Sequence, residues 1–300
     1  MDLEAISGAA TVALTSALLF IFVAKMWHLL NRSLASSQAF SDSIMREAAQ
    51  RFRDEFDRLS RNQSMYLGSA LVFAMLFVTA YVLEADRLFT GYPHWQLNLL
   101  LVAFGAAAML AAYRIGRTIW QRRQVKLARD ANIAIGHHLQ RIAVGLGRAY
   151  HDVETTEGTI DHIVVAHSGV YAINVIARRP RRHGAVEMNG NEIVFRPSGR
   201  GVSIVRAKAR IASLEREFRR LLDHRVRVRS VLAMPGWEIT GQSSDEHLLV
   251  NERSLPMLRG WKDSADYLMN EEVDALHDML TSRCRLVPGG RKQSEAASRS

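Results

Sequence analysis

The chain has 300 residues, with 39 Lys and Arg against 30 Asp and Glu, a formal net charge of +9 and one cysteine, Cys284. A single cysteine excludes an intrachain disulfide and a Cys-rich zinc site, and it fits a reducing compartment. The basic excess lies in residues 114–300, where it can serve phosphate binding or attraction to anionic headgroups.

Three apolar runs occupy the first third of the chain, at about residues 8–30, 65–84 and 97–115. Each is long enough to span a bilayer, so the sequence predicts three transmembrane helices in a membrane region covering residues 1–124. Lys and Arg concentrate after the first and third runs, which predicts an N-terminus outside and a C-terminal domain in the cytoplasm. We therefore expect a multi-pass protein of the plasma (inner) membrane, with the lipid bilayer as a partner.

An amphipathic cytosolic helix is predicted between the first two runs, at about residues 36–62. Its apolar stripe has helical spacing and consists of Phe40, Ile44, Ala48, Phe52, Phe56 and Leu59. The stripe favours packing on the C-terminal domain, or on a second copy of the chain in a homo-oligomer. A helix at headgroup level is the alternative, which the mixed charges of the polar face disfavour.

Residues 125–285 are typical of an α/β domain, and the polar tail at 286–300 is expected to be disordered. Helical character continues from residue 114 to about 144. Apolar runs at 163–165 and 170–176 predict two central strands paired as an antiparallel hairpin. Asn189-Gly190, between 186–188 and 192–195, predicts a second hairpin. A helix over 204–224, strands at 228–234 and 248–251, and a helix near 264–283 complete the domain.

The first hairpin carries a family resemblance in Ile160-Asp161-His162, in the turn with Gly169, and in Val170-Tyr171-Ala172-Ile173. This pattern resembles the nuclease-related domain (NERD), a branch of the PD-(D/E)XK nuclease superfamily. The resemblance implies a restriction-endonuclease-like α/β domain, with a mixed central sheet flanked by helices.

The resemblance also implies a site for Mg²⁺ or Mn²⁺, held by Asp161 and by the Glu of a Glu-x-Lys motif on the next strand. Here that motif is replaced by Asn174-Val175-Ile176, so Asn174 stands at a degenerate catalytic position. A Glu that commonly follows a Gly is replaced by His137 after Gly136, and Arg206 stands where a Gln is typical. One carboxylate is a poor Mg²⁺ site.

The sequence leaves two alternative sets of metal ligands open. Glu154, Glu157 or Glu187 can supply a relocated acid, because they lie in segments that flank the core strands. Alternatively, Asp161 with His162 and His137 can favour a transition metal. For Asp161 itself, a strand-entry carboxylate bonded to local backbone N–H groups is the structural alternative.

A basic stretch follows the first hairpin, where the superfamily's nucleic-acid groove begins. Together with the start of the helix at 204–224, it can form a stripe that contacts phosphates; its members are Arg178, Arg179, Arg181, Arg182, Arg206 and Lys208. The alternatives are a solvated loop or contact with an anionic lipid surface. Arg216, Arg219 and Arg220 alternate with Glu215 and Glu217, which predicts an ion-paired helix face.

Three functions follow from these observations, and the sequence leaves open whether the protein is an enzyme. The leading hypothesis is a membrane-anchored, NERD-like protein with a degenerate metal site, which binds nucleic acid or an anionic surface without efficient cleavage. The second is an active metal-dependent nuclease with relocated acids. The third is a non-enzymatic assembly or scaffold protein that self-associates through residues 40–59.

Overall fold

The computed structural model describes residues 45–66, 94–144, 147–180, 184–241, 246–261 and 263–285, and the single positions 25 and 68. The chain divides into two units. One contains Met1–Ala39, Asp57–Arg122 and Pro288–Ser300, and the other contains Phe40–Phe56 and Arg123–Val287. The second, which we call the α/β unit, carries both sheets and the candidate site.

The prediction of three transmembrane helices is wrong for the part of the chain described above, where no helix is both long and apolar enough to cross a membrane. The third predicted span, 97–115, belongs to α3 (His94–Ala143), one continuous helix that runs on through a strongly basic stretch. The bounds of the apolar run at 97–115 therefore do not coincide with the bounds of the helix that contains it. The spans predicted at 8–30 and 65–84 lie outside the described residues, apart from a few isolated positions. The predicted multi-pass inner-membrane placement, with the N-terminus outside, depends on these spans and is corrected with them.

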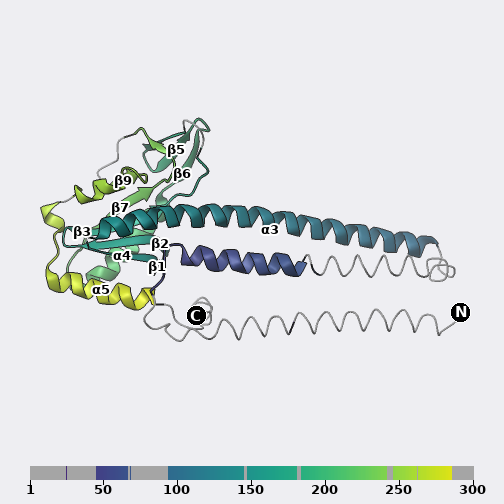
Figure 1. The fold of residues 1–300 in the computed structure, drawn as a ribbon, viewed down its shortest axis with the longest axis horizontal. Coiled ribbons are helices and arrows are strands. Elements are labelled where there is room, and N and C mark those ends of the chain that lie inside the picture. Colours follow the sequence, from purple (N-terminus) through teal and green to yellow (C-terminus); the bar gives the residue numbers. More distant parts are fainter. Residues whose placement is uncertain are drawn as a thin grey trace. The chain divides into compact units, whose positions relative to one another are not determined.

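The α/β fold class and its mixed sheet are confirmed (Figure 1). The larger sheet has five strands in the order β1-β2-β3-β7-β9, with bounds β1 (Arg148–Thr155), β2 (Gly158–Ala166), β3 (Gly169–Val175), β7 (Val228–Ala233) and β9 (His247–Val250). The first three strands are antiparallel, and β7 and β9 join in parallel. The predicted hairpin is β2–β3, with Ala166 opposite Gly169 across its turn. β1 was not predicted.

A smaller sheet of four strands has the order β6-β5-β4-β8, with bounds β4 (Ala185–Asn189), β5 (Glu192–Arg196), β6 (Arg200–Ser203) and β8 (Glu238–Ile239). The Asn189-Gly190 hairpin is confirmed as β4–β5, and Gly190 adopts the positive φ of 58° that its turn requires. Phe195 and Trp237 pack edge to face in the core beneath this sheet, with ring centroids 4.8 Å apart.

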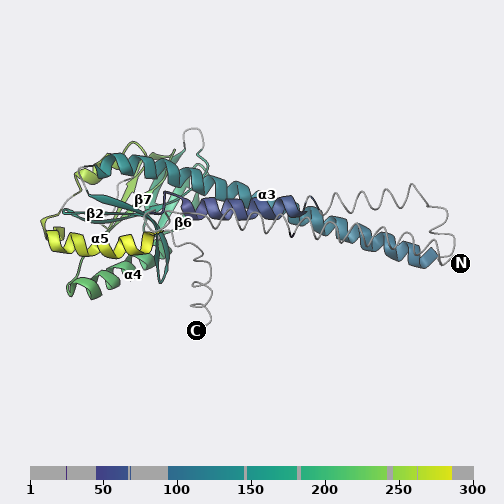
Figure 2. The ribbon, with the colours of Figure 1, turned by 60° about the horizontal axis from the view of Figure 1, so that its bottom comes forward.

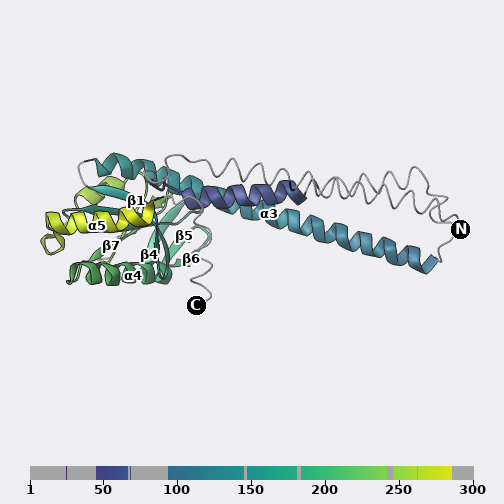
Figure 3. The same cartoon turned by 90° about the horizontal axis from the view of Figure 1, so that it is seen from below.

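Helices cover both faces of the larger sheet. α4 (Val205–Leu222) and α5 (Asn270–Cys284) lie side by side on one face, and the C-terminal part of α3 lies on the other (Figures 2 and 3). The first face buries Leu214 and Phe218 of α4 with Leu276 of α5, and the second buries Ile135 and Leu139 of α3. Short 3₁₀ helices at Leu255–Arg259 and Ser264–Asp266 precede α5. The last predicted helix therefore begins at Asn270 rather than near 264.

Candidate functional site

Three polar side chains form a row across the first three strands of the larger sheet. The register that pairs His151 with His162 also sets Asp152 opposite Asp161, and the β2–β3 register sets Asp161 opposite Asn174. All three side chains are buried, as are the neighbouring His151 and His162. Buried polar groups need partners, so the donors that reach this row define its chemistry.

Asp161 uses both carboxylate oxygens as acceptors. Oδ2 accepts the backbone N–H of Val175 at 2.8 Å, and Oδ1 accepts from the guanidinium of Arg51 at 3.2 Å. Burial raises the pKa of the Asp161 carboxyl from 3.8 to about 6, against the opposing effects of the Val175 N–H and the Arg51 charge. At neutral pH the carboxylate is therefore ionised and paired with Arg51.

Asp152 is a buried acid that the sequence did not single out. Its backbone has a positive φ of 51°, and its Oδ2 accepts the backbone N–H of Arg51 at 3.0 Å. Its Oδ1 is buried without a partner among the described residues. Burial raises the pKa of Asp152 above its usual value. Arg51 thus contacts two neighbouring acids, one through its backbone and the other through its side chain.

Arg51 reaches the site because the segment before and around it is fixed to the α/β unit. Arg46 donates from its backbone N–H to Cys284 O at 2.8 Å and from its side chain to Glu154 Oε1 at 2.9 Å. Ala48 lies against Gly136 of α3, where an added Cβ would be only 2.5 Å from the Ala48 Cβ. The helical residues 50–66 then start at this point, with Arg51 in the first turn.

Arg210 of α4 supplies the second guanidinium group. Its Nη1 donates to Asn174 Oδ1 at 3.1 Å and to the backbone oxygen of Thr159 at 2.8 Å. An open cleft of about 560 Å³ lies beside these contacts; its lining includes Arg51, Phe52, Glu157, Thr159, Asp161, Arg206 and Arg210. We call it the Asp161 cleft. Three arginines and two carboxylates share its wall.

The side chains in place do not fit the divalent cation that the resemblance implies. Both oxygens of Asp161 and the oxygen of Asn174 already accept hydrogen bonds, two of them from guanidinium groups. Ile176, at the Lys position of the motif, packs into the core beneath the smaller sheet and does not face the cleft. No group of three or more His, Cys, Asp or Glu with metal-site geometry occurs in the described ranges. The positive charge that a divalent cation would supply at this site is supplied by the arginine side chains instead.

The transition-metal alternative also fails on geometry, because neighbouring residues of a strand point to opposite faces. Asp161 lines the cleft together with Arg206 and Arg210 of α4, whereas the ring of His162 lies near Gly136 of α3. His162 Nδ1 is 2.8 Å from His151 Nδ1, an edge-to-face pair in which one ring donates to the other. Burial lowers the pKa of His151 to about 4, so this pair is neutral at physiological pH. His137 is exposed on α3.

The residues of the predicted basic stripe do not all line the Asp161 cleft. Arg206 lines the Asp161 cleft, whereas Lys208 forms an ion pair with Glu246 at 3.0 Å. The guanidinium of Arg178 stacks on the Phe195 ring, 4.5 Å from its centroid, and Arg179 is exposed. Arg181 and Arg182 lie outside the described residues.

The three glutamates proposed as relocated acids have separate environments. Glu154 pairs with Arg46 and Glu187 pairs with Arg196, both at the surface. Glu157 alone lines the Asp161 cleft. The contacts that sequence reasoning missed, through Arg51 and Asp152, carried no local signal in the chain.

Comparisons with family models, with curated proteins and with solved structures find no match to this chain. The likeness to the nuclease-related domain therefore stays a prediction, carried by the residues of β2 and β3.

Proposed function

We propose that the α/β unit is a nuclease-related domain that binds the phosphate groups of nucleic acid at the Asp161 cleft without efficient hydrolysis. The observation that carries the proposal is the position of two guanidinium groups, from Arg51 and Arg210, at the oxygens of Asp161 and Asn174. In a metal-dependent nuclease those oxygens are the ones expected to hold the cation.

Phosphate binding is supported by the exposure and geometry of the arginines. Arg206 is exposed, and the Arg51 side chain is 40% exposed although it contacts a buried carboxylate. A guanidinium group carries several N–H donors in a fixed plane, so it can retain one protein contact and still bind phosphate oxygens. The cleft is open, so a phosphate on a long chain can enter it.

Weak hydrolysis is supported by the residues at the motif positions. Phosphodiester cleavage needs a group that activates water and a positive charge that stabilises the developing phosphate charge. Arginine can stabilise that charge, but its guanidinium group stays protonated, so it cannot accept a proton from water. Asn174 is not a base either, and the Ile176 side chain is in the core.

An active nuclease remains the second candidate because of one observation. Asp152 and Asp161 lie opposite each other on adjacent strands, so a second acid does stand beside Asp161. For a cation to use both carboxylates, Arg51 has to leave them. The two candidates therefore differ in whether the site works with Arg51 in place.

The test uses the purified 300-residue chain with labelled single-stranded DNA and RNA, at low and high salt, in EDTA, Mg²⁺ or Mn²⁺. We expect salt-sensitive binding that is unchanged by EDTA, with the nucleic acid left intact. Arg206→Gln should weaken binding, whereas Arg200→Gln, an exposed arginine on β6 with the same charge change, should not. Metal-dependent cleavage that disappears in Asp161→Ala would refute the proposal in favour of the nuclease.

A further inference from the structure

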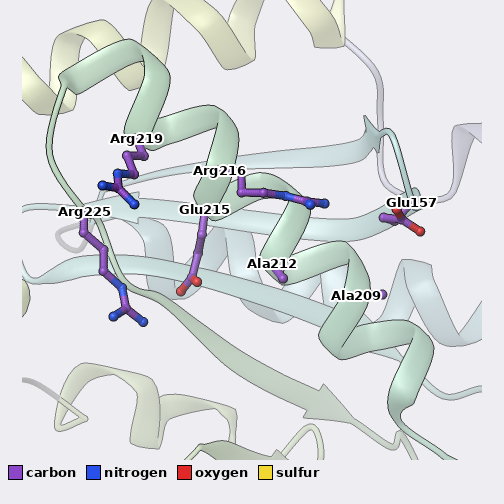
Figure 4. Close-up of a pocket in the computed structure, with 7 residues that line it drawn as sticks. All are labelled: Glu157, Ala209, Ala212, Glu215, Arg216, Arg219 and Arg225. Carbon is purple, nitrogen blue, oxygen red and sulfur yellow. The ribbon is translucent and has the colours of Figure 1, made fainter.

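The outward side of α4 carries a second hollow next to the Asp161 cleft. It has a volume of about 390 Å³ and is lined by Glu157, Ala209, Ala212, Glu215, Arg216, Arg219 and Arg225 (Figure 4). Glu157 and Ala209 line both spaces. The two hollows therefore adjoin along the helix, with small alanine side chains where they meet.

The arginines of the second hollow lack the partners that the sequence predicts for them. Glu215 turns toward the sheet, where its Oε1 accepts the Val228 N–H at 2.9 Å, and Glu217 pairs with Arg283 of α5. Arg216 and Arg219 consequently form no ion pair with any described residue. The prediction of an ion-paired face is wrong, because the packing of α4 uses its carboxylates elsewhere.

The arrangement leaves a row of cationic groups along one helix. Arg206, near the start of α4, lines the Asp161 cleft. Figure 4 shows Arg216 and Arg219 farther along the helix, with Arg225 beside Arg219. Thirteen residues of α-helix rise about 20 Å. If the strand keeps the base-stacked rise of B-form DNA, about 3.4 Å per nucleotide, that distance corresponds to about six phosphates.

We infer that the ligand of the Asp161 cleft is a chain of phosphodiesters that continues along α4 through the second hollow. This inference rests on the proposed function, and it assigns Arg216 and Arg219 as further phosphate contacts. These two guanidinium groups are exposed and form no ion pair within the described part of the chain, and alanines line the same hollow, which suits a backbone that approaches closely without base-specific contacts.

The test is a length series of single strands, from two to twelve nucleotides, measured by fluorescence anisotropy with the 300-residue chain. Oligothymidylate and oligouridylate are run in parallel, so that DNA and RNA are distinguished as sources of the backbone. We expect affinity to rise with length up to about six nucleotides and then to level off. The double variant Arg216→Gln/Arg219→Gln should bind the longer strands about tenfold more weakly and the dinucleotide as before.

The dependence of binding affinity on salt concentration is a second measurement of the same phosphate contacts. Each phosphate contact of a single strand contributes about 0.7 to the slope of log affinity against log salt, so the double variant should lower the slope by about 1.4. The matched control is Arg200→Gln/Arg253→Gln, which removes the same charge from exposed arginines outside both hollows. It should leave the length profile and the slope near those of the parent.

The outcomes separate this inference from the proposed function. If the Arg216/Arg219 variant binds long strands as the parent does, the path along α4 is refuted, while dinucleotide binding still supports the cleft. If control and variant weaken binding equally, the effect is net charge and the path is again refuted. If the parent binds no strand of any length, both proposals fail.

Discussion

Asp161→Asn removes the buried carboxylate of the candidate site and keeps a side chain of the same shape. The amide oxygen can still accept the Val175 N–H, so the main change is the loss of a charge and of its pairing with Arg51. In the parent, burial raises the pKa of this carboxyl from 3.8 to about 6. The folded state therefore binds this proton more tightly than the unfolded state does.

The sign and size of the effect follow from that shift. Because the folded-state pKa is the higher one, the stability contributed by this group is present at low pH and is lost as pH rises through about 6. The full loss is about 3 kcal/mol of the free energy of unfolding, of which about 2.4 kcal/mol develops between pH 4 and pH 7.5. The Asn variant lacks this loss, so it should become relatively more stable than the parent as pH increases.

The assay is urea unfolding at a series of pH values, followed by tryptophan fluorescence. The informative quantity is the difference in unfolding free energy between variant and parent, because other titrating groups cancel from it. Asp130→Asn, which removes an exposed carboxyl on α3 in the same way, serves as the control for the substitution itself. Parallel profiles for the parent and Asp161→Asn would refute the argument that burial outweighs the Arg51 ion pair.

Two further predictions concern the same region. Protonation of Asp161 below pH 6 frees the Arg51 guanidinium, so the parent should bind short oligonucleotides more tightly at pH 5 than at pH 7.5. Asp161→Asn should lose this pH dependence. A fluorescence titration in which the parent binds more weakly at pH 5 would contradict the prediction. Gly136→Ala should cost about 1–3 kcal/mol of stability through overpacking against Ala48, and this cost is offset in part by a gain of about 1 kcal/mol in helix propensity. Gly116→Ala is the control, because no described atom lies within 4 Å of its new Cβ, and it should show only the gain in helix propensity. Urea midpoints measure both variants, and equal midpoints would mean that the contact at Gly136 is not tight.

The sequence predicted the elements whose signals are local. The β4–β5 hairpin follows from Asn189-Gly190, and the helix predicted over 204–224 is α4, whose observed ends lie within two residues of the predicted ones. The opposition of Asp161 and Asn174 was not predicted, because the two-residue turn lies at 167–168, one residue before the turn with Gly169 that the sequence indicates, and a shift of one residue in the turn changes every pair behind it. The sequence therefore located the degenerate motif on β3, but not the residues opposite it in the sheet.

Other features depend on contacts that no local pattern records. β1 mixes polar and apolar residues and contains the positive φ of Asp152, so it lacks the apolar run of a central strand. The Arg51 contact joins residues 110 positions apart, and the same helical period would fit a surface arginine equally well. The membrane prediction failed for a related reason, since hydropathy reports composition along a helix and not where that helix begins and ends.

The α/β unit is assembled from two stretches of chain, with residues 57–122 inserted between them. During synthesis the short first stretch leaves the ribosome long before the strands that it will cover, so it has no surface to dock on until the later stretch has folded. Asp152 and Asp161 must therefore enter the sheet before Arg51 contacts them, or at the same time. Contacts of such long sequence separation slow folding, and the closing step is the one that neutralises the site. The same connectivity joins the inserted residues directly to Phe56, five residues from Arg51 in the chain.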